Sequence, residues 1–462
     1  MLDKTLLHDT LTAAMSTGGD FAEIFVENNA KNTINLINGV VEKAVAGIDY
    51  GAGIRIFNGH SAIYAYTNDT SRESLIKTAL TAANAINKTD YNSKLIKDFS
   101  HLDYIPAHTW QILPKDVQKK QIVSMIRQAH ESAKAQDALI TETSASYSDS
   151  VQDVLIVNTD GLWAEDRRVR TRSAFQAVAS DGTEKQDAFF GPGALKGFEF
   201  YDDINFKELG EKAAGIAVTM LKAGFCPSGK MPVIIDNGFG GVILHEACVH
   251  GLEATSVAKK SSVFSDKLGL KIASGIVTAV DDGTMPNQWG SLNIDDEGTP
   301  TRRNVLIENG VLKSFLVDRL NGLKMGMAST GSARRESYRF APTSRMTNTF
   351  IINGKDNQKD IFADTEYGLY AKKMGGGSVS PATGEFNFAV TEGYIVRNGK
   401  IAEPVRGATL IGKGHEILLN IDKISDNFSQ DQGMCGSESG SVPTNVGQPM
   451  IRVKELTVGG RQ

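Results

Sequence analysis

Cysteine is scarce in this chain, and long apolar runs and an excess of basic residues are absent. The 462 residues contain only three cysteines, Cys226, Cys248 and Cys435, and an odd, scattered set argues against a disulfide framework. No segment approaches the roughly 20 continuous apolar residues that span a bilayer, and the charged N-terminus lacks the apolar run of a signal peptide. A net charge of −5 and a pI near 6.0 indicate no nucleic-acid-binding domain. We therefore expect a cytoplasmic protein with no nucleic-acid partner and no membrane partner.

One stretch departs from this acidic balance, because residues 167–172 contain four arginines: Arg167, Arg168, Arg170 and Arg172. Side chains along a β-strand point alternately to its two faces. The every-other-residue spacing of the last three arginines therefore predicts one solvated face of a strand. A track of phosphate contacts is the less favoured alternative.

The length exceeds that of one ordinary core and predicts two or three domains. Residues 2–15 have helical spacing, strand-like alternation follows with a turn at Asn38-Gly39, and helical spacing returns in residues 71–86. The same order then recurs, from a helix that opens at Pro114 to one that stops at Gly224. We therefore predict a mixed α/β N-terminal region in which one helix–strands–helix unit is used twice.

The pattern changes after Gly224. Two prolines and no regular period occupy the segment from Gly224 to Pro232, which predicts the main domain boundary there. Beyond it, short apolar runs bounded by glycine or asparagine predict a β-rich barrel or sandwich-like domain, so the expected fold class is α+β. The predicted domains are residues 1–110 (N-terminal α/β), 111–224 (central α/β) and 225–462 (β-rich C-terminal).

The C-terminal region contains a short pattern of metal-binding residue types, GGVILHEACVHGLEA, from Gly240 to Ala254. His245 and His250 are five residues apart, and Glu246 follows the first histidine. On a regular α-helix, residues five apart differ by about 140° in direction, whereas residues four apart differ by about 40°. A π-bulge would return both imidazoles to one face. The spacing therefore predicts a metal site that needs a local distortion of the helix.

Two neutral imidazoles suit zinc, and Glu246 beside the first could take a proton from metal-bound water and pass it to a leaving amine. A catalytic zinc needs a third protein ligand, for which Glu253, His415 and Cys435 are candidates. Cys435 is the first choice, because the small residues around it let its backbone approach a metal closely. Glu253 could instead orient a ligand from behind, and Cys226 and Cys248 are expected to be buried thiols.

Several segments in order resemble the TldD/PmbA family of zinc metalloproteases, specifically its TldD-type subunit. Besides the histidine motif they are Ser261-Ser262-Val263-Phe264-Ser265, Asp296-Glu297-Gly298-Thr299-Pro300, Arg345-Met346-Thr347-Asn348-Thr349, Gly375-Gly376-Gly377, Gly433-Met434-Cys435-Gly436 and Val446-Gly447-Gln448-Pro449. The resemblance implies a Zn²⁺ ion held by His245, His250 and Cys435, with Glu246 as general acid/base. It also implies cleavage of unfolded or flexible peptides by a dimer, either a homodimer or a heterodimer with a PmbA-type (TldE) subunit.

Two residues depart from the family pattern. Val249 stands where the family usually has glycine, and a β-branched residue would be strained there if the backbone needed a positive φ. Ser437 stands where lysine is expected, which would alter substrate contacts more than metal binding. The alternative to a peptidase is therefore a non-catalytic peptide-binding or assembly subunit. A serine hydrolase using Ser437 or Ser439 has no Gly-x-Ser-x-Gly motif to support it.

The sequence leaves the role of Arg345 open between two readings. Its side chain could lie near a peptide carboxylate, or it could form a buried structural ion pair.

Overall fold

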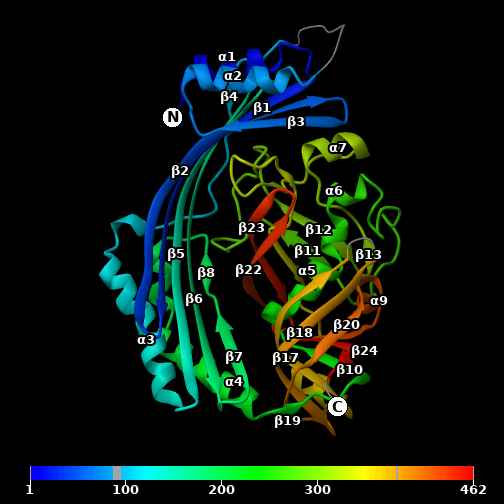
Figure 1. Ribbon diagram of the computed structural model, residues 1–462. Helices are drawn as coiled ribbons and strands as arrows, with labels where there is room; N and C mark the ends of the chain where they lie inside the picture. The colour runs from blue at the N-terminus through cyan, green and yellow to red at the C-terminus, as the bar shows by residue number, and fades with distance from the viewer. Residues whose placement is uncertain (1, 87–94, 381–382, 461–462) are drawn as a thin grey trace.

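The computed structural model describes residues 2–86, 95–380 and 383–460. Figure 1 shows a long curved sheet on one side of the molecule and a β-rich part on the other, with a pair of helices near each end of the sheet. The predicted α+β class, with a mixed N-terminal region followed by a β-rich C-terminal part, is confirmed. No helix within those described ranges is long and apolar enough to cross a membrane.

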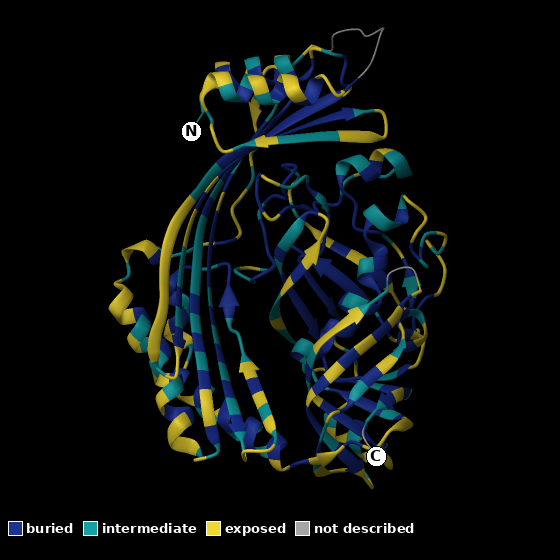
Figure 2. Cartoon of the chain, viewed as in Figure 1, coloured by how far each residue is buried: buried dark blue, intermediate teal, exposed yellow. Residues whose placement is uncertain are grey.

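Both helix–strands–helix units contribute to one eight-stranded sheet. Its strands are β1 (Phe21–Ile37), β2 (Val40–Asn58), β3 (Ser61–Thr67), β4 (Ser100–His101), β5 (Ile140–Asn158), β6 (Leu162–Ser180), β7 (Lys185–Phe190) and β8 (Gly193–Ala194). The main order is β3-β2-β1-β5-β6-β4, and β7 and β8 pair with β6. Strands β1 and β5 run antiparallel, with Glu23 opposite Asn158 and Ile37 opposite Ser144, which joins the two units. Figure 2 shows that the first half of β2 is exposed.

Four helices cover the two ends of this sheet: α1 (Lys4–Ala14), α2 (Arg72–Ala83), α3 (Lys119–Gln136) and α4 (Phe206–Lys222). Asp3 caps α1 by accepting a hydrogen bond from the Leu6 amide, as Ser71 and Asn205 do for α2 and α4. The helix predicted to open at Pro114 begins later. Residues Pro114–Asp116 form a separate 3₁₀ turn, because Val117 after them has extended backbone, and α3 starts only at Lys119.

The β-rich part combines a closed barrel with an open sheet. The ring of the barrel runs β10 (Gly229–Ile235), β24 (Ile451–Gly459), β20 (Thr409–Lys413), β18 (Glu385–Arg397) and β17 (Tyr367–Val379), which pairs back with β10. Strands outside the ring are β9 (Gly224–Phe225), β19 (Lys400–Arg406) and β21 (Ile421–Ile424). The open sheet has the order β13 (Val311–Leu312), β12 (Arg303–Glu308), β11 (Ala279–Asp282), β16 (Asn348–Ile351), β23 (Gly440–Gln448) and β22 (Ser429–Ser437), which places β22 at an edge.

Helix α5 (Val242–Ala247), which carries the first half of the histidine motif, lies between the barrel and the open sheet. It contacts β17 and β18 of the barrel and β16 of the open sheet. Its apolar side chains, including Val242 and Leu244, belong to the large buried core of this part. The remaining short elements are α6 (Ala254–Val257), α7 (Arg319–Met325), α8 (Gln358–Ala363), α9 (Gly414–Leu419), β14 (Ala333–Arg334) and β15 (Thr343–Ser344).

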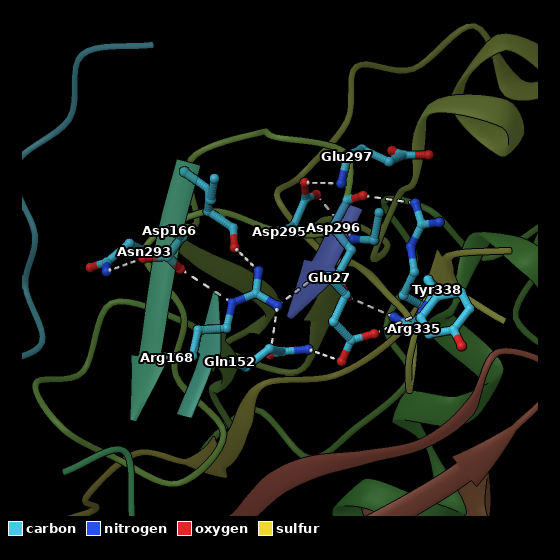
Figure 3. A network of polar contacts seen from close by, with 12 residues as sticks. Glu27, Gln152, Asp166, Arg168, Asn293, Asp295, Asp296, Glu297, Arg335 and Tyr338 are labelled. Atoms are coloured by element: carbon cyan, nitrogen blue, oxygen red, sulfur yellow. Dashed lines mark hydrogen bonds and ion pairs between the residues drawn. The ribbon is translucent and has the colours of Figure 1, made fainter. Parts of the chain in front are cut away.

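Buried ion pairs join the long sheet to the β-rich part, and Figure 3 shows the pair of Arg168 with Asp296. Arg55 lies 2.9 Å from Glu23 and 2.5 Å from Glu297, and Arg335 pairs with the second oxygen of Glu23 at 2.9 Å. Arg168 lies 2.7 Å from Asp296. Because removing one partner of a buried ion pair is strongly destabilising, these contacts fix how the two parts meet. We call this set the interface network: Glu23, Arg55, Arg168, Asp296, Glu297 and Arg335.

The prediction of a solvated arginine face is wrong. Arg168 and Arg170 are only 3% and 6% exposed, and their face of β6 is turned toward the β-rich part. Arg167, on the other face, has a side chain that is 49% exposed and pairs with Asp153. Alternating spacing identifies residues that share a face, but it does not say whether another part of the chain covers that face.

Candidate metal centre

The histidine motif follows a buried strand through a tight turn. Strand β10 leads into the 3₁₀ turn Gly238–Gly241 and then directly into α5. Gly241 is required for this packing, since a Cβ there would lie 2.5 Å from the backbone nitrogen and oxygen of Gly447 on β23. Close contact between this turn and β23 therefore places the start of α5 beside β23 of the open sheet.

The predicted local distortion of the helix is present, and it is a break in the helix rather than a π-bulge. The α-helix ends at Ala247, and Cys248 adopts φ −130° and ψ −58°. A 3₁₀ turn, Val249–Leu252, follows on a new path and begins with the Gly251 amide donating to the Cys248 carbonyl. Val249 is fully buried and is not among the residues with positive φ. The backbone strain that valine would suffer at a positive φ therefore does not arise.

The break brings both imidazoles to one sulfur. His245 Nε2 lies 3.3 Å from Cys435 Sγ, and His250 Nε2 lies 3.4 Å from the same atom. The possible ligand atoms of these three residues all lie within 4.8 Å of one another. In a tetrahedral zinc site, with Zn–S about 2.3 Å and Zn–N about 2.1 Å, sulfur and nitrogen lie roughly 3.5 Å apart. Two imidazoles and a thiol therefore form a donor set with the composition and spacing of a zinc site.

The other proposed ligands occupy different positions. Glu253 Oε2 lies 3.3 Å from Nδ1 of His250, the ring nitrogen that faces away from Cys435, so it can orient the imidazole from behind. The side chain of His415 is 42% exposed and lies outside the group of three. Glu246 Oε2 lies 3.6 Å from His250 Nε2 with a quarter of its side chain exposed, so it stands beside the ligand atoms and in contact with solvent.

The charges in this group favour a thiolate. Burial raises the pKa of the Cys435 thiol, but interaction with His245 and His250 outweighs burial and lowers the pKa to about 4. Burial lowers the pKa of His250, and Glu253 and Cys435 outweigh it and raise the pKa well above its ordinary value. A cation bound here would replace the proton that these groups share. By contrast, burial alone raises the pKa of Cys226 to about 11 and of Cys248 to about 12, in agreement with the prediction of buried thiols.

Arg345 contacts both the strand that carries Cys435 and Glu253 beside His250. It is fully buried and donates to the Cys435 carbonyl, to Ser439 Oγ at 3.0 Å and to the Gly440 carbonyl at 2.8 Å. Its Nε lies 3.9 Å from Glu253 Oε1. Arg345 therefore has the structural role that the sequence left open, and no part of it is available to a peptide carboxylate. Ser439, with its hydroxyl bound to this arginine, is also fully buried, which argues against a serine nucleophile there.

Comparison with known proteins agrees with the geometry. Family models for the PmbA/TldA metallopeptidase match the chain in three successive parts, domain 1 at residues 22–86, the central domain at 112–221 and the C-terminal domain at 228–460. The chain belongs to the PmbA/TldD metallopeptidase family. Its PmbA/TldD relatives include a metalloprotease TldD homolog of Haemophilus influenzae, 35% identical over 448 residues that cover 96% of this chain and 93% of the relative. A metalloprotease of Methanocaldococcus jannaschii is 32% identical over 437 residues, with 94% and 96% covered.

Solved structures share the PmbA/TldD fold. A Thermotoga maritima protein superposes with a TM-score of 0.80 at 23% identity, over 99% of this chain and 100% of the other. TldE of Thermococcus kodakarensis superposes with a TM-score of 0.78 at 18% identity, over 98% and 100%. At these identities the likeness shows the fold alone. The names of the curated relatives place the chain among metalloproteases of this family.

Proposed function

We propose that this chain is a zinc-dependent metallopeptidase of the TldD type that hydrolyses unfolded or flexible peptides, with Glu246 as general acid/base. The observation that carries the proposal is the meeting of His245 Nε2, His250 Nε2 and Cys435 Sγ beside the Glu246 carboxylate. A nitrogen and thiolate set of this kind favours zinc over magnesium or calcium, which prefer oxygen ligands. A zinc ion, when bound, supplies Lewis acidity that polarises a carbonyl and lowers the pKa of water.

Proton transfer and the positioning of the metal-binding side chains are assigned to residues of this chain. Glu246 Oε2, at the exposed side of the group, can take a proton from the attacking water and deliver it to the departing amine nitrogen. Glu253 holds His250 by its Nδ1 atom and so presents Nε2 to the centre. Arg345 holds the Cys435 backbone and neutralises Glu253. Each role follows from a contact of the described side chains.

The assembly and location of the protein form a further part of the proposal. We infer a dimer, either of two identical chains or with a PmbA-type (TldE) subunit, and the fold shared with a TldE protein supports this inference. Three free cysteines support a reducing, cytoplasmic location. The alternative function, a non-catalytic binding or assembly subunit, is disfavoured because the possible ligand atoms converge and Val249 avoids a positive φ.

The test separates metal binding from catalysis. Protein purified without chelator should contain about one zinc per chain by elemental analysis, as expected for a single three-ligand site. Glu246→Gln should keep that zinc and lose peptide cleavage by about 10²- to 10⁴-fold, because only the proton carrier is removed. Glu416→Gln, an exposed acid outside the group, is the matched control and should behave as the wild type. A wild-type chain purified without zinc, or undiminished cleavage by Glu246→Gln, would contradict the proposal.

A further inference from the structure

A cavity lined by arginines lies between the long sheet and the β-rich part. Its volume is about 360 Å³, and its lining includes Arg170 and Arg172 of β6, Arg334 of β14, Trp289, and Met434 and Ser441 of the β22–β23 hairpin. We call it the arginine cavity. Arg168, the next arginine along the same face, also reaches it, but Arg168 is bound to Asp296 and Gln152, as Figure 3 shows.

Five arginines line this cavity. Arg168 and Arg335 pair with carboxylates, but Arg170, Arg172 and Arg334 form no ion pair with any carboxylate of the described residues. Arg170 donates Nε to the Trp289 carbonyl at 3.3 Å and Nη2 to the Ser291 carbonyl at 3.1 Å. Arg334 donates Nη1 to the Met346 carbonyl at 2.5 Å, and Arg172 donates Nη2 to the Gln432 carbonyl at 3.5 Å. Within the described ranges none of the three forms an ion pair with a carboxylate, although Arg170 and Arg334 are only 6% and 2% exposed.

The lining also includes two carboxylates, Asp296 and Glu336, and neither forms an ion pair with these three arginines within the described ranges. Asp296 accepts from Arg168 Nη1 and from the Arg335 amide, each at 2.7 Å. Glu336 accepts from the Ser441 amide at 2.7 Å. Buried guanidinium groups without a directly paired carboxylate are unfavourable. Asp296 attracts Arg170 and Arg334, but burial and repulsion between arginines outweigh that attraction. Burial, with repulsion from Arg334 and Arg168, lowers the pKa of Arg170 to about 9. A bound anion would therefore offset the unfavourable free energy of burying these guanidinium groups close together.

The cavity lies close to the metal centre but on the other side of one hairpin. Met434, which lines the cavity, directly precedes Cys435 on β22. Successive side chains of a strand point to opposite faces, so Met434 faces the cavity while Cys435 faces the two histidines. A group bound in the cavity would thus belong to a part of the substrate away from the reacting bond.

We propose that the arginine cavity binds a carboxylate of the peptide substrate, either the C-terminal carboxylate or that of an acidic side chain. The proposal rests on the peptidase function proposed above, because a peptide is what supplies the carboxylate. The planar guanidinium group of arginine matches a carboxylate in geometry and charge. The charge-assisted hydrogen bonds between them are stronger than hydrogen bonds between neutral groups. The cavity would therefore select substrates by a carboxylate placed away from the bond that is cut.

The test measures binding separately from cleavage. Three fluorescent peptides derived from one neutral sequence are titrated against the full-length Glu246→Gln chain by fluorescence anisotropy. The first has a free C-terminal carboxylate and no acidic side chain, and the second is the same peptide amidated at its C-terminus. The third is amidated and contains a single glutamate. Loss of the carboxylate should weaken binding about 10- to 100-fold. Tight binding of the first peptide alone would assign the site to the C-terminus, and equal binding of the third would assign it to acidic side chains.

Substitutions at the cavity should remove this discrimination. Adding Arg334→Met or Arg170→Met should make all three peptides bind as weakly as the neutral one. Arg172→Met, which loses a single long hydrogen bond, tests the same point if the more buried variants do not fold. Arg167→Met is the matched control, because it removes an arginine from the opposite face of the same strand, and it should keep the discrimination. Equal binding of all three peptides to the parent chain, or discrimination that survives in the folded cavity variants, would overturn the proposal.

Cleavage of the same peptides by the zinc-loaded wild type keeps the two proposals apart. Cleavage without any carboxylate preference would overturn the cavity proposal and leave the peptidase function standing. Carboxylate-dependent binding without cleavage of any peptide would overturn the peptidase function and leave the cavity as a carboxylate site.

Discussion

The metal centre and the interface network are both buried groups of ionisable side chains, but they are assembled in different ways. At the metal centre, His245 and His250 lie in one short segment and only Cys435 comes from a distant strand. In the interface network every pair that joins the two parts is distant in sequence, such as Arg55 with Glu297 and Arg168 with Asp296. The network is complete in the chain itself, because each cation has its carboxylate. The candidate metal centre gathers nitrogen and sulfur donors, for which we propose zinc as the partner.

This difference predicts that substitutions in the two groups affect different properties of the protein. Removing a member of the interface network should damage the fold and leave the affinity of the folded chain for zinc unchanged. Removing a ligand should abolish zinc binding and activity while the fold survives. Four substitutions test this separation between effects on the fold and effects on zinc binding, and the substitution with the largest expected effect comes first.

Cys435→Ala should have the largest effect. The variant should lose bound zinc and lose peptide cleavage by at least about 10³-fold, because the metal supplies several kcal/mol of transition-state stabilisation. Elemental analysis and a peptide cleavage assay measure the two effects. Cys248→Ala is the matched control, since this thiol lies inside the same motif but outside the group of ligands. It should keep its zinc, and loss of zinc from both variants would contradict the ligand assignment.

Arg168→Met should have the next largest effect, on stability. The substitution leaves Asp166 and Asp296 buried without their cation, and breaking a buried ion pair in this way costs about 3–5 kcal/mol. Urea unfolding followed by circular dichroism gives the free energy of unfolding. The folded fraction should still bind about one zinc per chain. A variant as stable as the wild type would show that the interface network does not hold the two parts together.

Arg345→Lys should weaken the metal centre without removing a ligand. Lysine keeps the positive charge but cannot bond the Cys435 carbonyl and Ser439 while it faces Glu253. Loss of such supporting contacts typically costs about 10- to 100-fold in metal affinity. Competition with a chelator measures zinc affinity, and the absorption spectrum of the cobalt-substituted protein reports the thiolate bond. Unchanged affinity and spectrum would reduce Arg345 to a packing role.

Arg167→Met should have the smallest effect, under about 1 kcal/mol of stability, because its ion pair with Asp153 is half exposed. Together with Arg168→Met it compares two faces of one strand at neighbouring positions. Urea unfolding under the same conditions gives the comparison. If the two substitutions were equally costly, burial of the even-numbered arginines would not account for the difference between the faces.

Periodicity predicted much of the local structure. It gave the helix of residues 2–15, found as Lys4–Ala14, and the hairpin turn at Asn38-Gly39, where both residues have the positive φ that such a turn needs. It failed where tertiary packing decides the outcome. The face shared by Arg168 and Arg170 was recognised, but its cover comes from residues more than a hundred positions away.

The candidate site shows the same limit. The five-residue spacing predicts that the helix must be distorted. Either a π-bulge or a break at Cys248 could turn both imidazoles to one side, and the spacing does not distinguish them. The backbone of residues 248–252 follows the second solution. The distant Cys435 was the first choice among three candidates on chemical grounds, and the family resemblance implied the same ligand. The support from Arg345 depends on contacts that no local pattern encodes.

The X-ray absorption spectrum of zinc bound to the wild-type chain tests whether His245, His250 and Cys435 hold the ion. We expect a first coordination shell with one sulfur at about 2.3 Å and two imidazole nitrogens at about 2.0–2.1 Å, with the sulfur contribution absent from any zinc retained by Cys435→Ala. A shell of nitrogen and oxygen alone in the wild type would contradict this assignment.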